Sequence, residues 1–300
     1  MALQPYARLP REYRGLEVLA STVDAYGRTL WLLSDSPDAL PDDLSGNGGL
    51  TAPPRKQPYD ALLVMDRNGT VSELVLHDVH LLVGELDALP NGRFLLTGTA
   101  ARHRTPASAA ANAQIYGRDG RPRRSFPIGW PGHLLADRRH NVWTGYFDQA
   151  IYTDPISAPG LVRWDTGGNR QWAYQPPPGG EHIADCYALN VTDGVAWAYY
   201  YQAFSLIEIH TGGRLTIRET PVKGAHGLAV RGDQVTFLAD REGHDRLHRC
   251  RLTNGAVLLE EKTILTMPGG RPLGRYRAVG RAHALYLLDP PSHSWHVYLA

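Results

Sequence analysis

A short turn that ends in glycine recurs along this chain at a nearly constant spacing. The turn glycines are Gly69, Gly120, Gly168, Gly213 and Gly255, so successive steps are 51, 48, 45 and 42 residues. Strand-forming residues flank each turn, which is the pattern of a β-hairpin. Self-similarity at a period of this length predicts an architecture made of repeated supersecondary units.

A second series of turns lies out of phase with the first, and each of its turns precedes a strand with one large aromatic residue. These aromatics are Trp31, Phe94, Trp143, Trp197, Phe237 and Tyr286. Two interleaved turn series mean two hairpins, and therefore four strands, in each repeat. That is the pattern of a β-propeller blade. No segment has a convincing helical period.

The last repeat indicates how the ring closes. Residues 277–279, 284–288 and 295–299 predict three strands, and the fourth is missing. Residues 2–9 have no repeat of their own, so we predict that the segment 1–10 supplies the missing strand and removes an exposed edge. The result is a six-bladed propeller forming a single domain, residues 1–300. Seven blades, or a sandwich built of many hairpins, are the alternatives.

Two segments interrupt the repeats. Residues 36–58 contain five prolines and three glycines, a composition that does not bury enough apolar surface to order itself easily. We interpret this segment as a flexible insertion in the first blade, in the position of a flap. A shorter, alanine-rich insertion is expected at residues 102–112.

Composition excludes several classes of protein. The formal net charge is +1, which argues against a nucleic-acid partner. No apolar run approaches the length of a membrane span or of a signal peptide, so neither a membrane partner nor a secretory leader is expected. Two cysteines do not make a disulfide framework. A cytoplasmic location is the resulting expectation.

Residues 133–143 read His-Leu-Leu-Ala-Asp-Arg-Arg-His-Asn-Val-Trp. This segment resembles the strand–turn–strand unit of NHL-repeat propellers and of virginiamycin B lyase, and residues 226–230 are similar to the start of the same unit. The resemblance implies a propeller. Such propellers include lyases, lactone hydrolases and binding modules. No family catalytic motif matches here, so the resemblance assigns no catalytic residue.

In a propeller, ligands commonly bind where the inner strands begin and the second strands end. Histidines, carboxylates and tyrosines gather at those positions and predict an amphipathic cup at the channel mouth. The candidate catalytic residues are His133, His226, Asp148 and Asp185. The candidate substrate-binding residues are Tyr146, Gln149, Tyr200, Gln202, His182, Arg277 and Glu85.

Each candidate has a structural alternative. His133 and His226 fall at nearly equivalent repeat positions and can share a divalent metal with Asp185 or Glu85. A histidine at a strand start more often caps a backbone group, and no HxH or HExxH spacing favours a metal. Asp148 can act as an acid or base beside aromatic walls, or it can close a turn. No cofactor motif is evident, because the sequence lacks GxSxG, P-loop and GxGxxG patterns.

The sequence therefore predicts binding of a small molecule at the channel mouth. If the protein is an enzyme, we expect it to be a lyase, isomerase, cyclase or hydrolase. Whether it catalyses a reaction is left open. The alternative is a non-catalytic propeller that binds a peptide or protein partner on its rim.

Overall fold

The computed structural model describes residues 1–35, 57–99, 111–241 and 244–300. Two compact units contain these residues. Unit 1 comprises Met1–Leu9 and Pro177–Ala300, and unit 2 comprises Pro10–Pro176. The predicted insertions at residues 36–58 and 102–112 lie almost entirely outside the described residues. The single domain over residues 1–300 stays a prediction.

Unit 2 contains three four-stranded antiparallel sheets, one for each of the first three repeats. The first sheet is β2 (Glu17–Val23), β3 (Thr29–Ser34), β4 (Tyr59–Arg67) and β5 (Thr70–Val79). The second is β6 (Val83–Leu89), β7 (Arg93–Gly98), β8 (Ala113–Tyr116) and β9 (Pro122–Phe126). The third is β10 (Pro131–Ala136), β11 (Asn141–Tyr146), β12 (Leu161–Asp165) and β13 (Arg170–Ala173). Short 3₁₀ turns occur at η1 (Arg11–Tyr13) and η3 (Pro90–Gly92).

Unit 1 repeats the same plan. One sheet is β14 (Asp185–Thr192), β15 (Val195–Tyr201), β16 (Leu206–His210) and β17 (Leu215–Arg218). The next is β18 (Ala225–Arg231), β19 (Gln234–Arg241), β20 (His244–Leu252) and β21 (Val257–Ile264). The last is β22 (Arg277–Arg281), β23 (Ala284–Asp289), β24 (Ser294–Leu299) and β1 (Gln4–Arg8), with the 3₁₀ turn η5 (Pro290–Ser292). A short parallel pairing joins β14 to β22.

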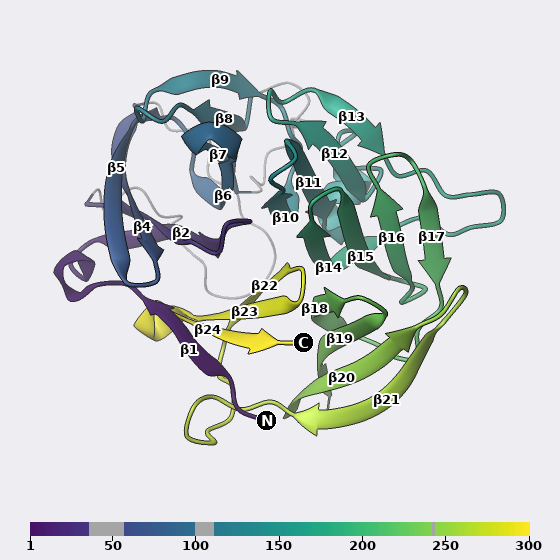
Figure 1. Cartoon of the computed structure of the whole chain (residues 1–300). Helices are drawn as coiled ribbons and strands as arrows, with labels where there is room; N and C mark the ends of the chain where they lie inside the picture. Colours follow the sequence, from purple (N-terminus) through teal and green to yellow (C-terminus); the bar gives the residue numbers. More distant parts are fainter. Residues whose placement is uncertain (36–56, 100–110, 242–243) are drawn as a thin grey trace. The chain divides into compact units, whose positions relative to one another are not determined.

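The amino-terminal strand completes the last sheet. β1 pairs antiparallel with β24, and the two strands lie side by side in Figure 1. Leu3 and Leu9, which flank β1, are each only 2% exposed. The ring of Tyr6 lies 4.8 Å from that of Tyr286 on β23. The predicted fourth strand is therefore present, whereas the number of blades and the closure of a whole ring stay predictions.

Aspartates fix several of the hairpin turns. In each of these turns, one carboxylate oxygen accepts hydrogen bonds from main-chain N–H groups two and four residues further along the chain. The aspartates are Asp24, Asp137 and Asp165. Such side-chain contacts favour a tight turn. Glycine completes the turn where φ is positive, as at Gly168 (φ +82°).

The prediction for the aromatic series is confirmed, because each of these residues lies on the second strand of its sheet. Trp31, Trp143 and Phe237 are completely buried. Each hydrophobic cluster joins neighbouring sheets of one unit face to face, for example β2–β5 against β6–β9 and β18–β21 against β22–β24. The sheets β6–β9 and β18–β21 are thus covered on both faces, as a propeller blade requires.

Polar side chains tie the inner strands of neighbouring sheets together. In unit 2, the buried carboxylate of Asp87 on β6 accepts a hydrogen bond from the Ala136 N–H on β10 at 2.6 Å. In unit 1, the Asn190 amide on β14 donates to the carbonyls of Leu228 and Ala282, each at 2.9 Å. These bonds satisfy buried backbone groups where the innermost strands meet.

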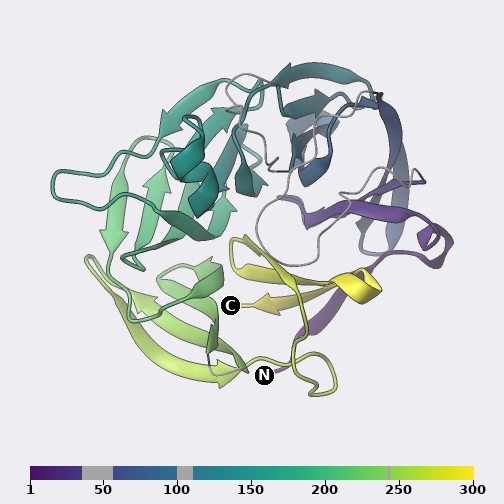
Figure 2. The same cartoon turned by 180° about the vertical axis from the view of Figure 1, so that it is seen from behind.

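One short helix was not expected from the sequence. The helix α1 (Asp148–Thr153) follows β11 and packs Ala150 and Ile151 against the core of its own unit. Figure 2 shows it in teal beside the strands of its sheet. Six residues make fewer than two turns, too few to produce a helical period in the sequence.

Candidate functional site

The inner strands of unit 1 all begin at the same end of that unit. β14 and β22 are parallel. β18 runs in the same direction, because Gly227 lies against Ala278 and the Val230 N–H donates to the carbonyl of Ala282. Their starts bring three predicted site residues to one end: Asp185, His226 and Arg277.

A chain of hydrogen bonds links three of the side chains at this end. The hydroxyl of Tyr276 donates to the carboxylate of Asp245, and Nε2 of His226 contacts the same hydroxyl. The rings of His226 and Tyr276 lie 5.4 Å apart. The three residues come from β18, the segment before β22 and the start of β20, which are far apart in the sequence.

This arrangement fixes the tautomer of His226. An ionised Asp245 can only accept, and a phenol carries one proton, which Tyr276 gives to Asp245. Nε2 of His226 must then be the donor to the tyrosine oxygen. In the neutral imidazole the proton is therefore on Nε2.

Aromatic rings gather at the same end of unit 1, where β15 ends beside the start of β14. Tyr187 and Tyr201 stack with their centroids 5.8 Å apart and their planes 11° apart. Phe204 packs edge-on against both rings. Tyr201 is 39% exposed, and it lies opposite Asp185 in the strand register. Apolar surface and a carboxylate thus lie next to each other.

The other predicted site residues of unit 1 differ in how deeply their side chains are buried. Tyr200 is 1% exposed and packs inside the unit. His182 and Gln202 are exposed beside β14 and β15. Burial raises the pKa of the Cys186 thiol, next to Asp185, as expected of an unreactive cysteine.

In unit 2, Glu85 and His133 are half-buried at the starts of β6 and β10. Tyr146 is completely buried, and its hydroxyl donates to the carbonyl of Ile128 at 2.7 Å. Burial also raises the pKa of Tyr146. Its side chain is therefore part of the core. Asp148 and Gln149 are exposed at the start of α1, where the Asp148 carboxylate accepts a hydrogen bond from the Gln149 N–H at 2.6 Å.

The structure brings Asp185, His226 and Arg277 to one end of unit 1, and Glu85 and His133 to the strand starts of unit 2. A common cup formed by all the candidates stays a prediction. Within the described ranges, no three His, Cys, Asp or Glu side chains are placed to hold a metal ion. In the same part of the chain, no helix is long and apolar enough to cross a membrane.

Sequence reasoning missed Tyr276 and Asp245. Tyr276 lies between Arg275 and Arg277, in a segment without a repeat position. The carboxylate of Asp245 accepts the hydrogen bond of Tyr276 and so belongs to the hydrogen-bond chain.

A small cavity of about 20 Å³ lies against Tyr276 and is also lined by Arg275 and His296. A space of this size holds about one water molecule. Burial lowers the pKa of His296, which favours its neutral form.

No known family model matches the sequence, and no curated protein sequence matches it. Among solved structures, the chain is similar to virginiamycin B lyase from Staphylococcus aureus, with 14% identity, a TM-score of 0.52 and 99% of each chain covered. It is also similar to a streptogramin B lyase, with 13% identity, a TM-score of 0.50, and 99% of this chain and 87% of that chain covered. Identities this low show a shared fold and do not assign a reaction. The repeated four-stranded sheets and these similarities identify the chain as a β-propeller, without assigning an individual propeller family.

Proposed function

We propose that this propeller binds a small molecule at the end of unit 1 where the inner strands begin. The observation that carries the proposal is the hydrogen-bond chain from Asp245 through Tyr276 to His226. A half-buried imidazole with a fixed tautomer, beside aromatic rings, is a common element of ligand sites. The exposed ring of Tyr201 supplies an apolar wall.

In this proposal, His226 is the proton-accepting group and Asp245 acts through Tyr276 as a positioning group. Arg277, at the start of β22, would attract an anionic part of the ligand, and Asp185 would accept a hydrogen bond from a polar part. The similarity to lyases supports the propeller fold, and a proton-transfer reaction on the bound molecule is the form of catalysis that the imidazole suits best.

The test is retention of small molecules from a metabolite extract. The purified protein is equilibrated with the extract and washed, and retained compounds are identified by mass spectrometry. We expect at least one compound to be retained by the wild type and lost in His226→Asn. The matched control is His140→Asn, which changes an exposed turn histidine of unit 2 and should leave retention unchanged. Identical retention by all three proteins would rule out the site.

Binding of a divalent metal is a further part of the proposal, tested separately by metal analysis of the purified protein. Bound metal that is lost in the double variant His133→Ala and His226→Ala would support it. No bound metal, together with unchanged stability of the double variant, would remove it.

A second candidate function is binding of a protein partner on the outer rim. Three large apolar side chains are exposed on the outer strand β21: Leu258, Leu259 and Ile264. Exposed apolar side chains on one strand favour a contact surface. Replacing Leu258 and Ile264 with serine should abolish co-purification of a partner without affecting small-molecule retention, and the opposite result would favour the strand-start site. The cytoplasmic location stays a prediction.

A further inference from the structure

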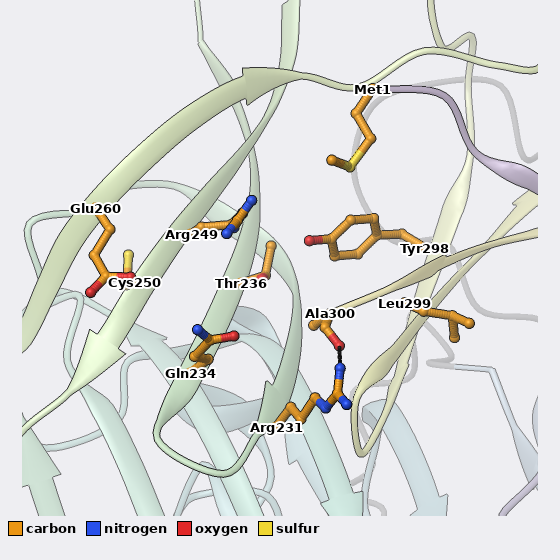
Figure 3. Close-up of a pocket in the computed structure, with 10 residues that line it drawn as sticks. All are labelled: Met1, Arg231, Gln234, Thr236, Arg249, Cys250, Glu260, Tyr298, Leu299 and Ala300. Atoms are coloured by element: carbon orange, nitrogen blue, oxygen red, sulfur yellow. Dashed lines mark hydrogen bonds between the residues drawn. The ribbon is translucent and has the colours of Figure 1, made fainter.

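Unit 1 holds a cavity of about 300 Å³, away from the strand starts. One side of it comes from the sheet β18–β21 and the other from β24, as Figure 3 shows. Arg231 is the last residue of β18, whereas His226 lies near the start of that strand. The cavity is therefore at the opposite end of β18 from the hydrogen-bond chain of Tyr276.

The strand register explains why polar side chains line this space. Gln234 and Thr236 are two residues apart on β19, so both point to the same face. Arg231 lies opposite Gln234, and Arg249 lies opposite Thr236. The sheet face that meets β24 thus carries four hydrogen-bonding side chains, whereas Val235, between Gln234 and Thr236, packs into the core on the other face.

Two hydroxyl-bearing residues of the cavity are almost completely buried. Thr236 is 3% exposed and Tyr298, on β24, is 8% exposed. Both line the cavity, together with the exposed Gln234. Polar groups this deeply placed are normally satisfied by protein, water or a ligand. The cavity is the space from which such partners can come.

Two arginines and one glutamate line the cavity, and the glutamate, Glu260, is paired with Arg251 outside it. The lining side chains therefore carry a net positive charge, which favours an anion. Arg249 pairs with Glu261 at 2.9 Å, which uses one of its five N–H donors. Arg231 donates to the main-chain oxygen of Ala300 at 3.3 Å and forms no ion pair with an Asp or Glu side chain among the described residues. Both guanidinium groups keep donors for a carboxylate, which they bind with high geometric specificity.

Size and apolar surface then narrow the class of ligand. The ring of Tyr298 and the side chains of Met1 and Leu299 add apolar walls. A volume of about 300 Å³ is at the lower end of cavities that hold small organic ligands, and a bare inorganic anion would leave most of it unfilled. We propose that this cavity binds a small organic carboxylate, with the carboxylate at Arg231 and Arg249 and its body against Tyr298.

The experiment uses the full chain and three probes: benzoate, benzyl alcohol as a neutral molecule of similar shape, and inorganic phosphate. Binding is measured by ligand-observed NMR and calorimetry. We expect benzoate to bind at least about tenfold more tightly than benzyl alcohol, because a hydrogen-bonded charge contributes that much. Equal binding of benzoate and benzyl alcohol would overturn the proposal, and so would phosphate that binds as tightly as benzoate.

Two arginines of unit 1 provide a matched pair of variants. Arg249→Met removes a cavity donor, whereas Arg214→Met removes an exposed arginine that contacts His210 and does not line the cavity. We expect Arg249→Met to weaken benzoate binding about tenfold and Arg214→Met to leave it unchanged. Tyr298→Phe should weaken it by a smaller factor, and Tyr276→Phe should have no effect. Equal losses in the two arginine variants would overturn the assignment.

Discussion

Three polar side chains carry the functional argument at the scale of the residue. Tyr276 is the middle one, and it does two things at once: it gives its proton to Asp245 and it accepts from His226. A phenol in this position links the carboxylate to the imidazole through one hydroxyl. The orientation of His226 therefore depends on a hydroxyl that is not itself at the start of an inner strand.

The variant Tyr276→Phe tests this dependence, because it keeps the ring and removes only the hydroxyl. We expect the Nε2–H form of His226 to lose its preference, which nitrogen-15 NMR of the imidazole detects. Retention of a ligand at the strand-start site should fall with it, whereas stability should fall by only about 1 kcal/mol, the contribution of one hydrogen bond. Tyr13→Phe is the control, since Tyr13 also donates to a carboxylate, that of Glu73, without a histidine. An unchanged tautomer in Tyr276→Phe would contradict the proposed role.

The sequence predicted part of this site. His226, Asp185 and Arg277 were identified because they begin strands at equivalent repeat positions. Tyr146 and Tyr200 were also chosen, and both are buried. Alternation along a strand separates its two faces, but both faces of a blade are covered by neighbouring sheets. The pattern therefore did not tell which tyrosines point toward a ligand. Tyr276 lies outside every strand, where no periodicity applies.

At the scale of the element, the hairpins were predictable because their causes are local. An aspartate, a turn and a glycine lie within five residues, and the contacts of Asp137 with Arg139 and Asn141 need no distant partner. The helix α1 has no comparable signal, because its stability comes from packing Ala150 and Ile151 onto a core assembled from other strands.

Asp137→Ala should destabilise the hairpin of β10 and β11. The carboxylate is almost completely buried and accepts hydrogen bonds from two main-chain N–H groups and the Asn141 amide. Losing them should cost about 2 kcal/mol, measured by thermal unfolding and by amide exchange in these two strands. The control is Asp119→Ala, in an exposed turn, which should leave the melting temperature nearly unchanged. Equal effects would show that the buried contacts do not stabilise the turn.

An ion-pair network on β16 and β17 predicts a pH dependence of stability. Burial raises the pKa of Glu208, but hydrogen bonds from Arg218 and His210 outweigh it and lower the pKa below its usual value. The ionised carboxylate therefore stabilises the folded state above the unfolded pKa, near 4.5. This contribution is lost as the pH falls through the lower, folded pKa.

Glu208→Gln should accordingly lower the melting temperature at pH 7, and this effect should become smaller at pH 4 and below as the contribution is lost. Thermal unfolding over this pH range gives the comparison. Glu261→Gln removes a more exposed carboxylate, paired with Arg249, and should change the melting temperature little at either pH. A Glu208→Gln effect that is the same at pH 7 and pH 4 would contradict the assignment.

At the scale of the whole molecule, the two interleaved turn series predicted the strand order within each four-stranded sheet, because each turn joins two consecutive antiparallel strands. What the repeat does not determine is the closure of a ring, which depends on contacts between the first and the last repeat. The pairing of β1 with β24 satisfies one edge of the last sheet. If the ring is closed, a variant that loosens β1 should also destabilise the first sheet, β2–β5.

The double variant Leu3→Asp and Leu9→Asp tests closure, because it places charges at two buried positions that flank β1. A ring closed by β1 predicts faster amide exchange in β2–β5 as well as in β22–β24. The comparison is Leu206→Ala, which weakens the cluster between the sheets β14–β17 and β18–β21 by about 2 to 5 kcal/mol, a cluster that contains no residue flanking β1. Both variants are expected to lose stability. Closure is therefore supported only if amide exchange in β2–β5 rises in the double variant and not in the comparison variant. Exchange that rises only in β22–β24 would mean that β1 completes a sheet without closing a ring.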